Sequence, residues 1–219
     1  MFEIALPIVL VTAAYLIGGI PIGVLVSHSR GVDIRKYGSG NIGASNVLRT
    51  LGVKAGLAVW LADVTKGLLP VVGARLALAG MVSDQQIELW LSLAALAVVA
   101  GHCFSPYLKL TGGRGVSTGL GALIAIDWRV GAVALAVWIV GVAISRYISL
   151  GSILAAASSP LLFVVYTDSP YYLALGVTLA VLVIERHRPN IGRLMTGTEH
   201  RIRQKAKKIA REPNDGSNQ

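Results

Sequence analysis

The alternation of long apolar stretches with short polar clusters is the feature that most constrains the fold of this chain. Almost every cluster of Gly, Asn, Ser, His and Arg follows every second apolar stretch. If each stretch crosses a membrane once, these clusters emerge on the same face, which becomes rich in anion-binding groups. The sequence predicts membrane-spanning helices at 4–27, 55–79, 88–101, 116–126, 130–145, 152–167 and 171–184.

Composition supports a membrane protein and argues against other classes. Hydrophobic residues make up 54% of the 219 residues and charged residues only 14%, whereas a soluble domain carries about a quarter charged residues. Period-2 alternation is absent, which argues against an outer-membrane barrel. The net charge of +9 is concentrated in particular loops, so it indicates topology rather than nucleic-acid binding. We expect an all-α polytopic integral membrane protein with about seven transmembrane helices.

The distribution of basic residues predicts the orientation in the membrane. Glu3 precedes the first apolar stretch, and Arg30 follows it. Of the 20 Lys and Arg residues, 17 fall within 28–54, 102–115, 146–151 and 185–219. Because short loops rich in Lys and Arg stay in the cytoplasm, we expect the N-terminus outside and the C-terminus inside.

The chain is predicted to form a single membrane domain over residues 1–211, because no composition shift divides it. A disordered polar tail is expected at 212–219. The segment 200–219 starts with many basic residues. Its first half either forms a short helix on anionic lipid headgroups or stays a solvated, positively charged tail.

The first polar loop contains GSGNIG at 38–43, which formally matches the dinucleotide-binding pattern G-x-G-x-x-G. The context does not fit, because a membrane span precedes it and no βαβ unit surrounds it. Glycines still allow successive backbone N–H groups to converge on an anion, and further side-chain donors come from Ser39, Asn41, Ser45 and Asn46. Arg49 can supply charge to a phosphate. The alternative is a glycine-rich turn without a ligand.

The second polar loop repeats this pattern as GGRGVSTG at 112–119. Gly112, Gly113 and Gly115 surround Arg114, just before a predicted helix. A helix N-terminus behind a glycine loop favours anion binding. The spacing differs from a Walker A motif, so the loop predicts a phosphate site of another kind.

The third loop and one predicted span carry polar residues with two readings each. Ser149 and Ser152 can donate hydrogen bonds to a substrate or cap the following helix. Asp63 and Lys66 lie three residues apart within the span at 55–79. Ionisable residues inside a membrane are usually functional, but these two can also simply neutralise each other.

The fourth loop places His187 and Asn190 three residues apart, and they are flanked by Arg186, Arg188 and Arg193. His187 can exchange protons near neutral pH, and Asn190 can donate to a developing oxyanion. The alternative is a pair of polar residues at the membrane boundary. The four histidines lack metal-ligand spacing, so no metal site is expected.

Five ordered segments resemble the PlsY-type family, the bacterial acyl-phosphate:glycerol-3-phosphate acyltransferases. The resemblance extends over the whole length from the first span to Glu199. The matching segments are GSGNIGASNVLRTLG (38–52), DVTKG (63–67), GHCFSPYLKLTGGRGVSTGLG (101–121), SRYISLGSI (145–153) and HRPNIGRLMTGTE (187–199).

The resemblance implies an enzyme of the bacterial cytoplasmic membrane with its active site on the cytoplasmic face. It would transfer a fatty acyl group from acyl phosphate to the 1-hydroxyl of glycerol 3-phosphate, giving lysophosphatidate and phosphate. It also implies that no cofactor is needed, and it suggests a functional link to an enzyme that forms acyl phosphate. Both substrates and the lipid bilayer are thus the expected partners, without nucleic acid.

The resemblance also assigns roles to individual residues. Ser39 and Arg49 match functional positions of the first motif, and the glycine loop at 112–115 matches a motif implicated in glycerol-phosphate binding. His187 and Asn190 match an important pair, and Glu199 matches an acidic residue with a more structural role. Where the family usually has KGGKG, this chain has TGGRG at 111–115, so a guanidinium replaces a lysine ammonium.

Two other functions compete with the acyltransferase. A transporter for an organic anion or phosphate ester would carry its polar residues near the middle of the membrane. A paralogue could acylate a related polyol phosphate, given the altered glycine loop. A CDP-alcohol phosphotransferase is excluded, because the sequence lacks an Asp-rich metal motif.

Overall fold

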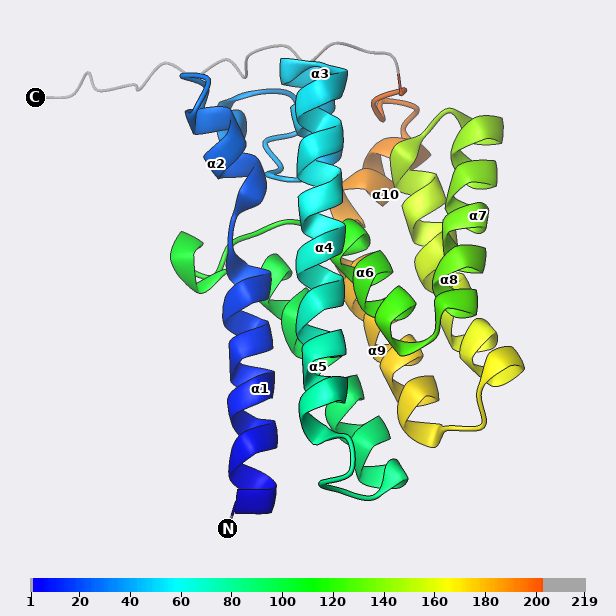
Figure 1. Ribbon diagram of the computed structural model, residues 1–219. Coiled ribbons are helices and arrows are strands. Elements are labelled where there is room, and N and C mark those ends of the chain that lie inside the picture. Colours follow the sequence, from blue (N-terminus) through cyan, green and yellow to red (C-terminus); the bar gives the residue numbers. More distant parts are fainter. Residues whose placement is uncertain (1, 203–219) are drawn as a thin grey trace, which may run out of the picture.

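Helices make up all the regular structure in the computed structural model, which describes residues 2–202 (Figure 1). Residues 203–219 lie outside the described part, so the predictions of a basic segment at 200–219 and of a disordered tail at 212–219 are not tested beyond residue 202. Two short 3-10 helices, Ile34–Lys36 and Pro106–Leu108, lie in the loops. The α-helices are α1 (Phe2–Gly19), α2 (Ile22–His28), α3 (Ala44–Leu51), α4 (Val53–Leu78), α5 (Asp84–Cys103), α6 (Val116–Ile126), α7 (Trp128–Ser145), α8 (Ile148–Tyr166), α9 (Pro170–Arg186) and α10 (Arg188–Met195).

All seven predicted apolar stretches are helical, which confirms the all-α class. Within residues 2–202, five helical stretches are long and apolar enough to cross a membrane, while α6 has 11 residues and α9 has 17. The sequence reasoning did not predict α3 and α10 as separate short helices. The five long stretches are Ile4–His28, Val53–Leu78, Asp84–Cys103, Trp128–Ser145 and Ile148–Tyr166.

The first predicted span is not one continuous helix but breaks between α1 and α2. Pro21 has no N–H to continue the ladder, so the chain changes direction there. Polar side chains bind the carbonyl oxygens at the break: Lys66 Nζ donates to Ile20 O at 2.8 Å, and Ser105 Oγ donates to Gly19 O at 2.6 Å. The break is thereby fixed to α4 and to the loop after α5.

Helix α5 lies at the centre of the bundle and packs against α1, α4, α6 and α9. Most of its buried positions are small or β-branched, such as Ala94 and Val98, and Leu91 and His102 are the exceptions. A side chain at Gly18 or Gly101 would overlap the backbone of the facing helix, so these glycines allow α1 and α5 to approach closely. Large side chains such as Ile144 face outward, as expected of a surface in contact with lipid.

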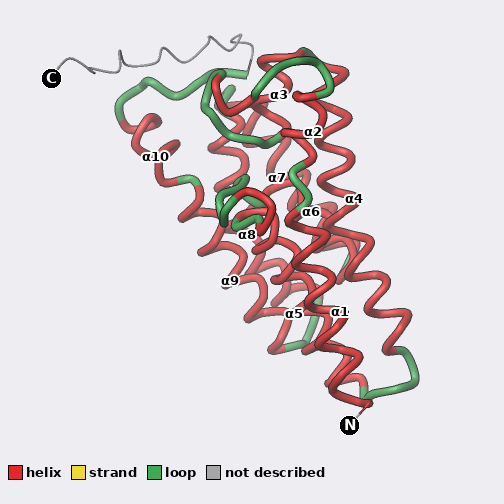
Figure 2. The backbone as a smooth tube through the Cα atoms, turned by 90° about the vertical axis from the view of Figure 1, so that its left-hand side faces the viewer, coloured by secondary structure: helices red, strands yellow, loops and turns green. Residues whose placement is uncertain are grey.

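The polar loops gather toward one end of the bundle. Helices α2, α3 and α10 lie together at this end in both views, and the start of α1 lies at the opposite end (Figures 1 and 2). The loop between α5 and α6 lies lower along the bundle, since α6 is short (Figure 1). This arrangement brings the four predicted polar loops around one volume.

Candidate active site

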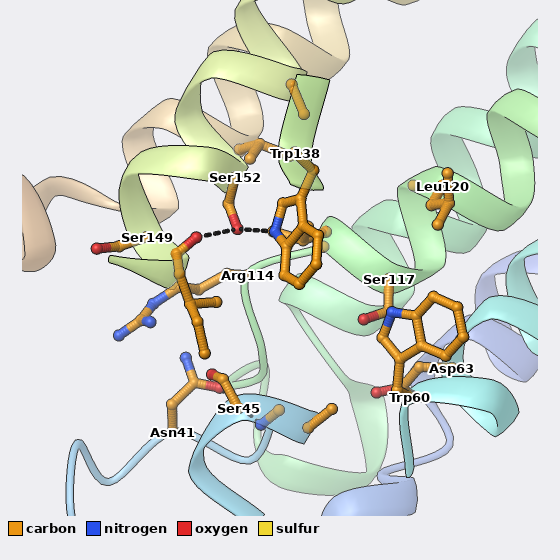
Figure 3. A pocket seen from close by; sticks show the side chains of 18 of the residues that line it. Asn41, Ser45, Trp60, Asp63, Arg114, Ser117, Leu120, Trp138, Ser149 and Ser152 are labelled. Carbon is orange, nitrogen blue, oxygen red and sulfur yellow. Dashed lines mark hydrogen bonds between the residues drawn. The ribbon is translucent and has the colours of Figure 1, made fainter. Parts of the chain in front are cut away.

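A cavity of about 400 Å³ lies among α3, α4, α6, α7, α8 and the junction of α9 with α10. Figure 3 shows side chains from several helices reaching it, including Trp60 of α4 and Trp138 of α7. Such a volume suits a small-molecule site. Its polar lining includes Asn41, Ser45, Arg49, Arg114, Ser149, Ser152, His187, Asn190 and Glu199. Its apolar lining includes Leu48, Leu57, Trp60, Val116, Leu120, Leu123, Leu135 and Trp138.

The glycine loop at 38–43 is shaped from inside by Asn46, which is fully buried. Its Nδ2 lies within 3.2 Å of the carbonyl oxygens of Ile34, Tyr37 and Asn41, and its Oδ1 accepts from the Ser39 N–H at 3.2 Å. Asn46 therefore holds the loop rather than pointing at a ligand. The sequence reasoning grouped it with the anion donors, because nothing local distinguishes an inward from an outward amide.

The second glycine loop rests on the end of α5. The Gly113 N–H donates to the His102 carbonyl at 3.0 Å, which satisfies a carbonyl of the last helical turn. Arg186, the last residue of α9, donates to the carbonyl oxygens of Gly112 at 3.0 Å and Gly113 at 3.1 Å. Gly112 and Gly113 thus face the scaffold, whereas Arg114 and Gly115 line the cavity.

Gly115 precedes α6 with a φ of 82°, a left-handed conformation that favours glycine. A Cβ at this position would lie only 2.9 Å from Val99 Cγ1 and 3.0 Å from Cys103 Sγ. The turn directs the chain into α6 immediately after Arg114. The glycines flanking Arg114 are therefore required by backbone conformation and by close packing.

Glu199 connects the third and fourth loops. Its Oε1 accepts from Ser149 Oγ at 2.9 Å and from Asn190 Nδ2 at 2.7 Å, while its Oε2 accepts from Arg193 Nε at 2.7 Å. Burial raises the pKa of Glu199, but these hydrogen bonds outweigh burial and hold the pKa below its ordinary value. The carboxylate is therefore charged and fixes three side chains. We call this part of the cavity the polar end; the residues that line it are Arg49, Arg114, His187, Asn190 and Glu199.

His187 is only 2% exposed and lines the cavity. Its Nδ1 lies 2.8 Å from the Val183 carbonyl oxygen, which can only accept, so Nδ1 carries the proton. Burial, with a smaller contribution from Arg114, lowers the pKa of His187 to about 4. At neutral pH the ring is therefore uncharged, and its Nε2 has a lone pair free to accept a proton.

Three arginines give the polar end its positive charge. Burial lowers the pKa of Arg114 to about 10 and also lowers that of Arg49, so both stay protonated at neutral pH. Arg193 adds to this field and lowers both values further. Within residues 2–202, several buried polar atoms here have no hydrogen-bond partner: Ser39 Oγ, Arg49 Nε, Asn190 Oδ1, Arg193 Nη2 and His200 Nδ1. The donors among them, on Ser39, Arg49 and Arg193, suit an anionic ligand, whereas Asn190 Oδ1 can only accept a hydrogen bond.

Other predicted site residues lie in different surroundings. Ser152 Oγ donates to the Ile148 carbonyl at 2.9 Å and accepts from Trp138 Nε1 at 3.2 Å (Figure 3). Ser39 and Arg193 adjoin the polar end without lining the cavity. Arg188 points away, with its side chain 79% exposed and 3.6 Å from Glu185. The structure thus does not bring Arg188 to the other residues.

Asp63 and Lys66 form an ion pair, with 2.8 Å between Nζ and Oδ1. His102 Nδ1 lies 3.7 Å from the same carboxylate oxygen. Asp63 and His102 both line the cavity. Across residues 2–202, no group of three or more His, Cys, Asp or Glu side chains could hold a metal ion.

Comparison with known proteins places these features in a family. A family model described as glycerol-3-phosphate acyltransferase matches residues 8–197. The glycerol-3-phosphate acyltransferase of Geobacter sulfurreducens is 44% identical over 197 residues, covering 90% of this chain and 97% of the relative. That of Clostridioides difficile is 41% identical over 204 residues, covering 93% and 98% of the two chains.

Two crystal structures of PlsY (YgiH), described as an integral membrane glycerol 3-phosphate acyltransferase, share the fold. The glycerol 3-phosphate form superposes with a TM-score of 0.83 at 38% identity, and the lysophosphatidic acid form with 0.80 at 37%. Each covers 89% of this chain and 94% of the crystal chain. With its helical bundle and polar loops around one cavity, this chain belongs to the glycerol-3-phosphate acyltransferase family of integral membrane proteins.

Proposed function

We propose that this protein transfers a fatty acyl group from acyl phosphate to the 1-hydroxyl of glycerol 3-phosphate, giving lysophosphatidate and phosphate. The observation that carries the proposal is the division of one cavity into a cationic end and an apolar remainder. Arg49 and Arg114 would hold phosphate groups, and the apolar walls between α4, α6, α7 and α8 would hold the acyl chain. Related crystal structures bearing the names of the acceptor and product forms support this reading.

Acyl phosphate is the donor that fits this site best. Acyl-CoA and acyl carrier protein carry large headgroups that need a docking surface beyond the short loops. Acyl phosphate is small, and its phosphate suits a glycine loop with arginines beside it. We expect acyl-CoA to be a poor donor, and comparable turnover with both donors at equal concentration would contradict this.

The proposed reaction is a direct transfer in which His187 acts as the base. Its Nε2 takes the proton of the 1-hydroxyl as the glycerol oxygen attacks the acyl carbon. The new ester C–O bond forms, the C–O bond to phosphate breaks, and phosphate leaves with the electron pair before it takes the proton from His187. Asn190 keeps a second amide hydrogen, beyond the one bonded to Glu199, to stabilise the oxyanion.

A substrate-assisted route is the alternative, in which the donor phosphate takes the hydroxyl proton and His187 only positions groups. Neither route needs an acyl-enzyme. Ser152 Oγ already donates to a backbone carbonyl, and Ser39 Oγ does not line the cavity. Recovery of a radiolabelled acyl-serine would overturn the direct transfer. Because acyl phosphate is already activated, the reaction also needs no metal or organic cofactor, and EDTA should leave the rate unchanged.

We also propose seven crossings, with the N-terminus outside and the active site at the cytoplasmic face. The concentration of Lys and Arg in the polar loops supports this orientation. Single cysteines at Arg30 and Met81 would test it, since these positions lie at opposite ends of the bundle and Cys103 is buried. In intact cells, an impermeant thiol reagent should label Met81→Cys and spare Arg30→Cys. The reverse pattern would invert the topology.

The decisive experiment is product formation by purified protein in detergent. Acyl phosphate and glycerol 3-phosphate should yield equimolar phosphate and lysophosphatidate, with none from a heat-treated control. Release of phosphate without lysophosphatidate would indicate hydrolysis instead of transfer. If neither product forms and sealed vesicles with the protein accumulate glycerol 3-phosphate, the transporter is the correct function. A higher rate with another polyol phosphate would identify the paralogue.

A further inference from the structure

Asp63, Lys66 and His102 form a buried polar cluster to which the proposed mechanism assigns no role. Lys66 Nζ joins the Asp63 carboxylate at 2.8 Å and the Ile20 carbonyl at 2.8 Å. All three side chains are less than a tenth exposed. Charged groups inside a membrane bundle are costly, and removing a single partner leaves an uncompensated charge. Because Asp63 and His102 also line the cavity, the cluster can affect the residues that bind substrate there.

His102 connects this cluster to the second glycine loop by two contacts. Its ring lies between Asp63, with Nδ1 3.7 Å from Oδ1, and Gly113, where a Cβ would overlap Nε2. Its backbone carbonyl accepts from the Gly113 N–H at 3.0 Å. The ring thus occupies the space that a side chain at position 113 would need. The position of the imidazole and the position of the loop are therefore mutually dependent.

Arg186 closes the loop from the other side. Its guanidinium donates to the carbonyl oxygens of Gly112 and Gly113 and lies 5.2 Å from the ring centre of Phe104. The backbone before Arg114 is thus held from α5 through its N–H and from α9 through its carbonyls. On the α5 side, His102 contacts the ion pair of Asp63 and Lys66 on α4. Lys66 in turn bonds the Ile20 carbonyl at the break after α1.

We infer that Asp63, Lys66 and His102 are positioning residues that set the location of Arg114 through Gly113. This inference rests on the proposed function, in which Arg114 binds a substrate phosphate. The cluster does not take a proton from substrate. It holds the imidazole against Gly113, so that the guanidinium of Arg114 enters the same part of the cavity as Arg49.

Two variants test the inference. Asp63→Asn/Lys66→Met removes both charges together and so avoids leaving one of them buried alone. His102→Phe keeps a ring of similar size against Gly113 but loses the nitrogen that faces Asp63. Each should raise both the KM for glycerol 3-phosphate and its Kd by about tenfold, with kcat within about threefold, because a misplaced binding group weakens phosphate contact. The Kd is measured calorimetrically without donor, so it does not depend on turnover.

Arg75→Met is the matched control. Arg75 is another cation within α4, and it donates to the carbonyl oxygens of Ala125 and Ile126 at the far end of α6. It does not line the cavity. This variant should lower the melting temperature in detergent and leave the KM and Kd for glycerol 3-phosphate unchanged.

The outcomes separate the possible roles. Variants that lose thermal stability yet keep the wild-type KM and Kd would show a purely structural cluster and overturn the inference. A loss of kcat by orders of magnitude at unchanged KM would overturn it in favour of a catalytic role. If the wild-type protein forms no lysophosphatidate, the proposed function fails instead. Raised Kd values in the two variants would then still report a displaced phosphate site.

Discussion

Replacement of Glu199 by glutamine tests how far the polar end depends on one carboxylate. Glutamine keeps one oxygen, which can still accept from Ser149 and Asn190. Its amide NH2 then faces Arg193 Nε, so two donors meet where a 2.7 Å charge-assisted hydrogen bond stood. Hydrogen bonds to charged groups contribute about 1.5–3 kcal/mol. Because the Arg193 side chain is 29% exposed, solvent screening places the loss near the lower end of that range.

The expected result is a fall of about 10- to 30-fold in kcat/KM, at about 1.4 kcal/mol per tenfold. Initial rates of phosphate release, with glycerol 3-phosphate varied at saturating acyl phosphate, measure this directly. Asp127→Asn is the matched control, since Asp127 accepts from Arg129 at 2.6 Å on α7, away from the cavity. Its kcat/KM should stay within about twofold of wild type, because the pair lies outside the cavity and its arginine is 48% exposed.

A double variant separates the hydrogen bond from other effects of the substitution. Once Arg193→Met has removed the donor, Glu199→Gln should cost much less than it does alone, because the two side chains act as a unit. Retention of kcat/KM within threefold by Glu199→Gln, at unchanged melting temperature, would show that the polar end does not depend on this carboxylate and so contradict the prediction. Equal losses in Glu199→Gln and Asp127→Asn would refute it too.

Four further results are expected. His187→Asn should lose about 10²–10⁴-fold in kcat at unchanged KM, and a near-wild-type kcat would assign the proton to the donor phosphate. The His187 ring, followed by NMR against that variant, should titrate near its pKa of about 4, so it is neutral above pH 5; a midpoint near 6.5 would contradict the burial argument. Asn46→Ala should lower stability by about 1–3 kcal/mol, measured by thermal unfolding, because it leaves buried carbonyls unpaired. Arg188→Ala should keep full activity, whereas Arg114→Gln should raise the KM for glycerol 3-phosphate at least tenfold.

The helices could be predicted from the sequence because hydropathy is a local property. All seven apolar stretches became helices, and the one at 116–126 has the predicted bounds. The break at Pro21 was missed, because it is stabilised by Lys66 and Ser105 from distant parts of the chain. Helices α3 and α10 have eight residues each and mix polar with apolar side chains, so no long apolar stretch marks them in the sequence.

The three arginines around His187 show the limit of prediction for the site. Arg186, Arg188 and Arg193 look equivalent in the sequence, but the chain changes direction at His187, between α9 and α10. Arg186 therefore reaches the second glycine loop, Arg188 faces outward, and Arg193 bonds Glu199. The signal that could have identified Arg186 is its position at a helix end, opposite a loop whose carbonyls have no helical partner.

The charges brought together at the polar end also bear on the order of events in the proposed reaction. Arg49, Arg114 and Arg193 face one ionised Glu199, so these four side chains together carry a charge of about +2, which matches one phosphate dianion. Asp63 and Lys66 cancel each other and add nothing. A second dianion in the same volume would exceed this balance. Loss of the acyl group would leave the phosphate as a trianion, so the proton it gains lowers its charge to that of a dianion and favours its departure before lysophosphatidate occupies the arginines.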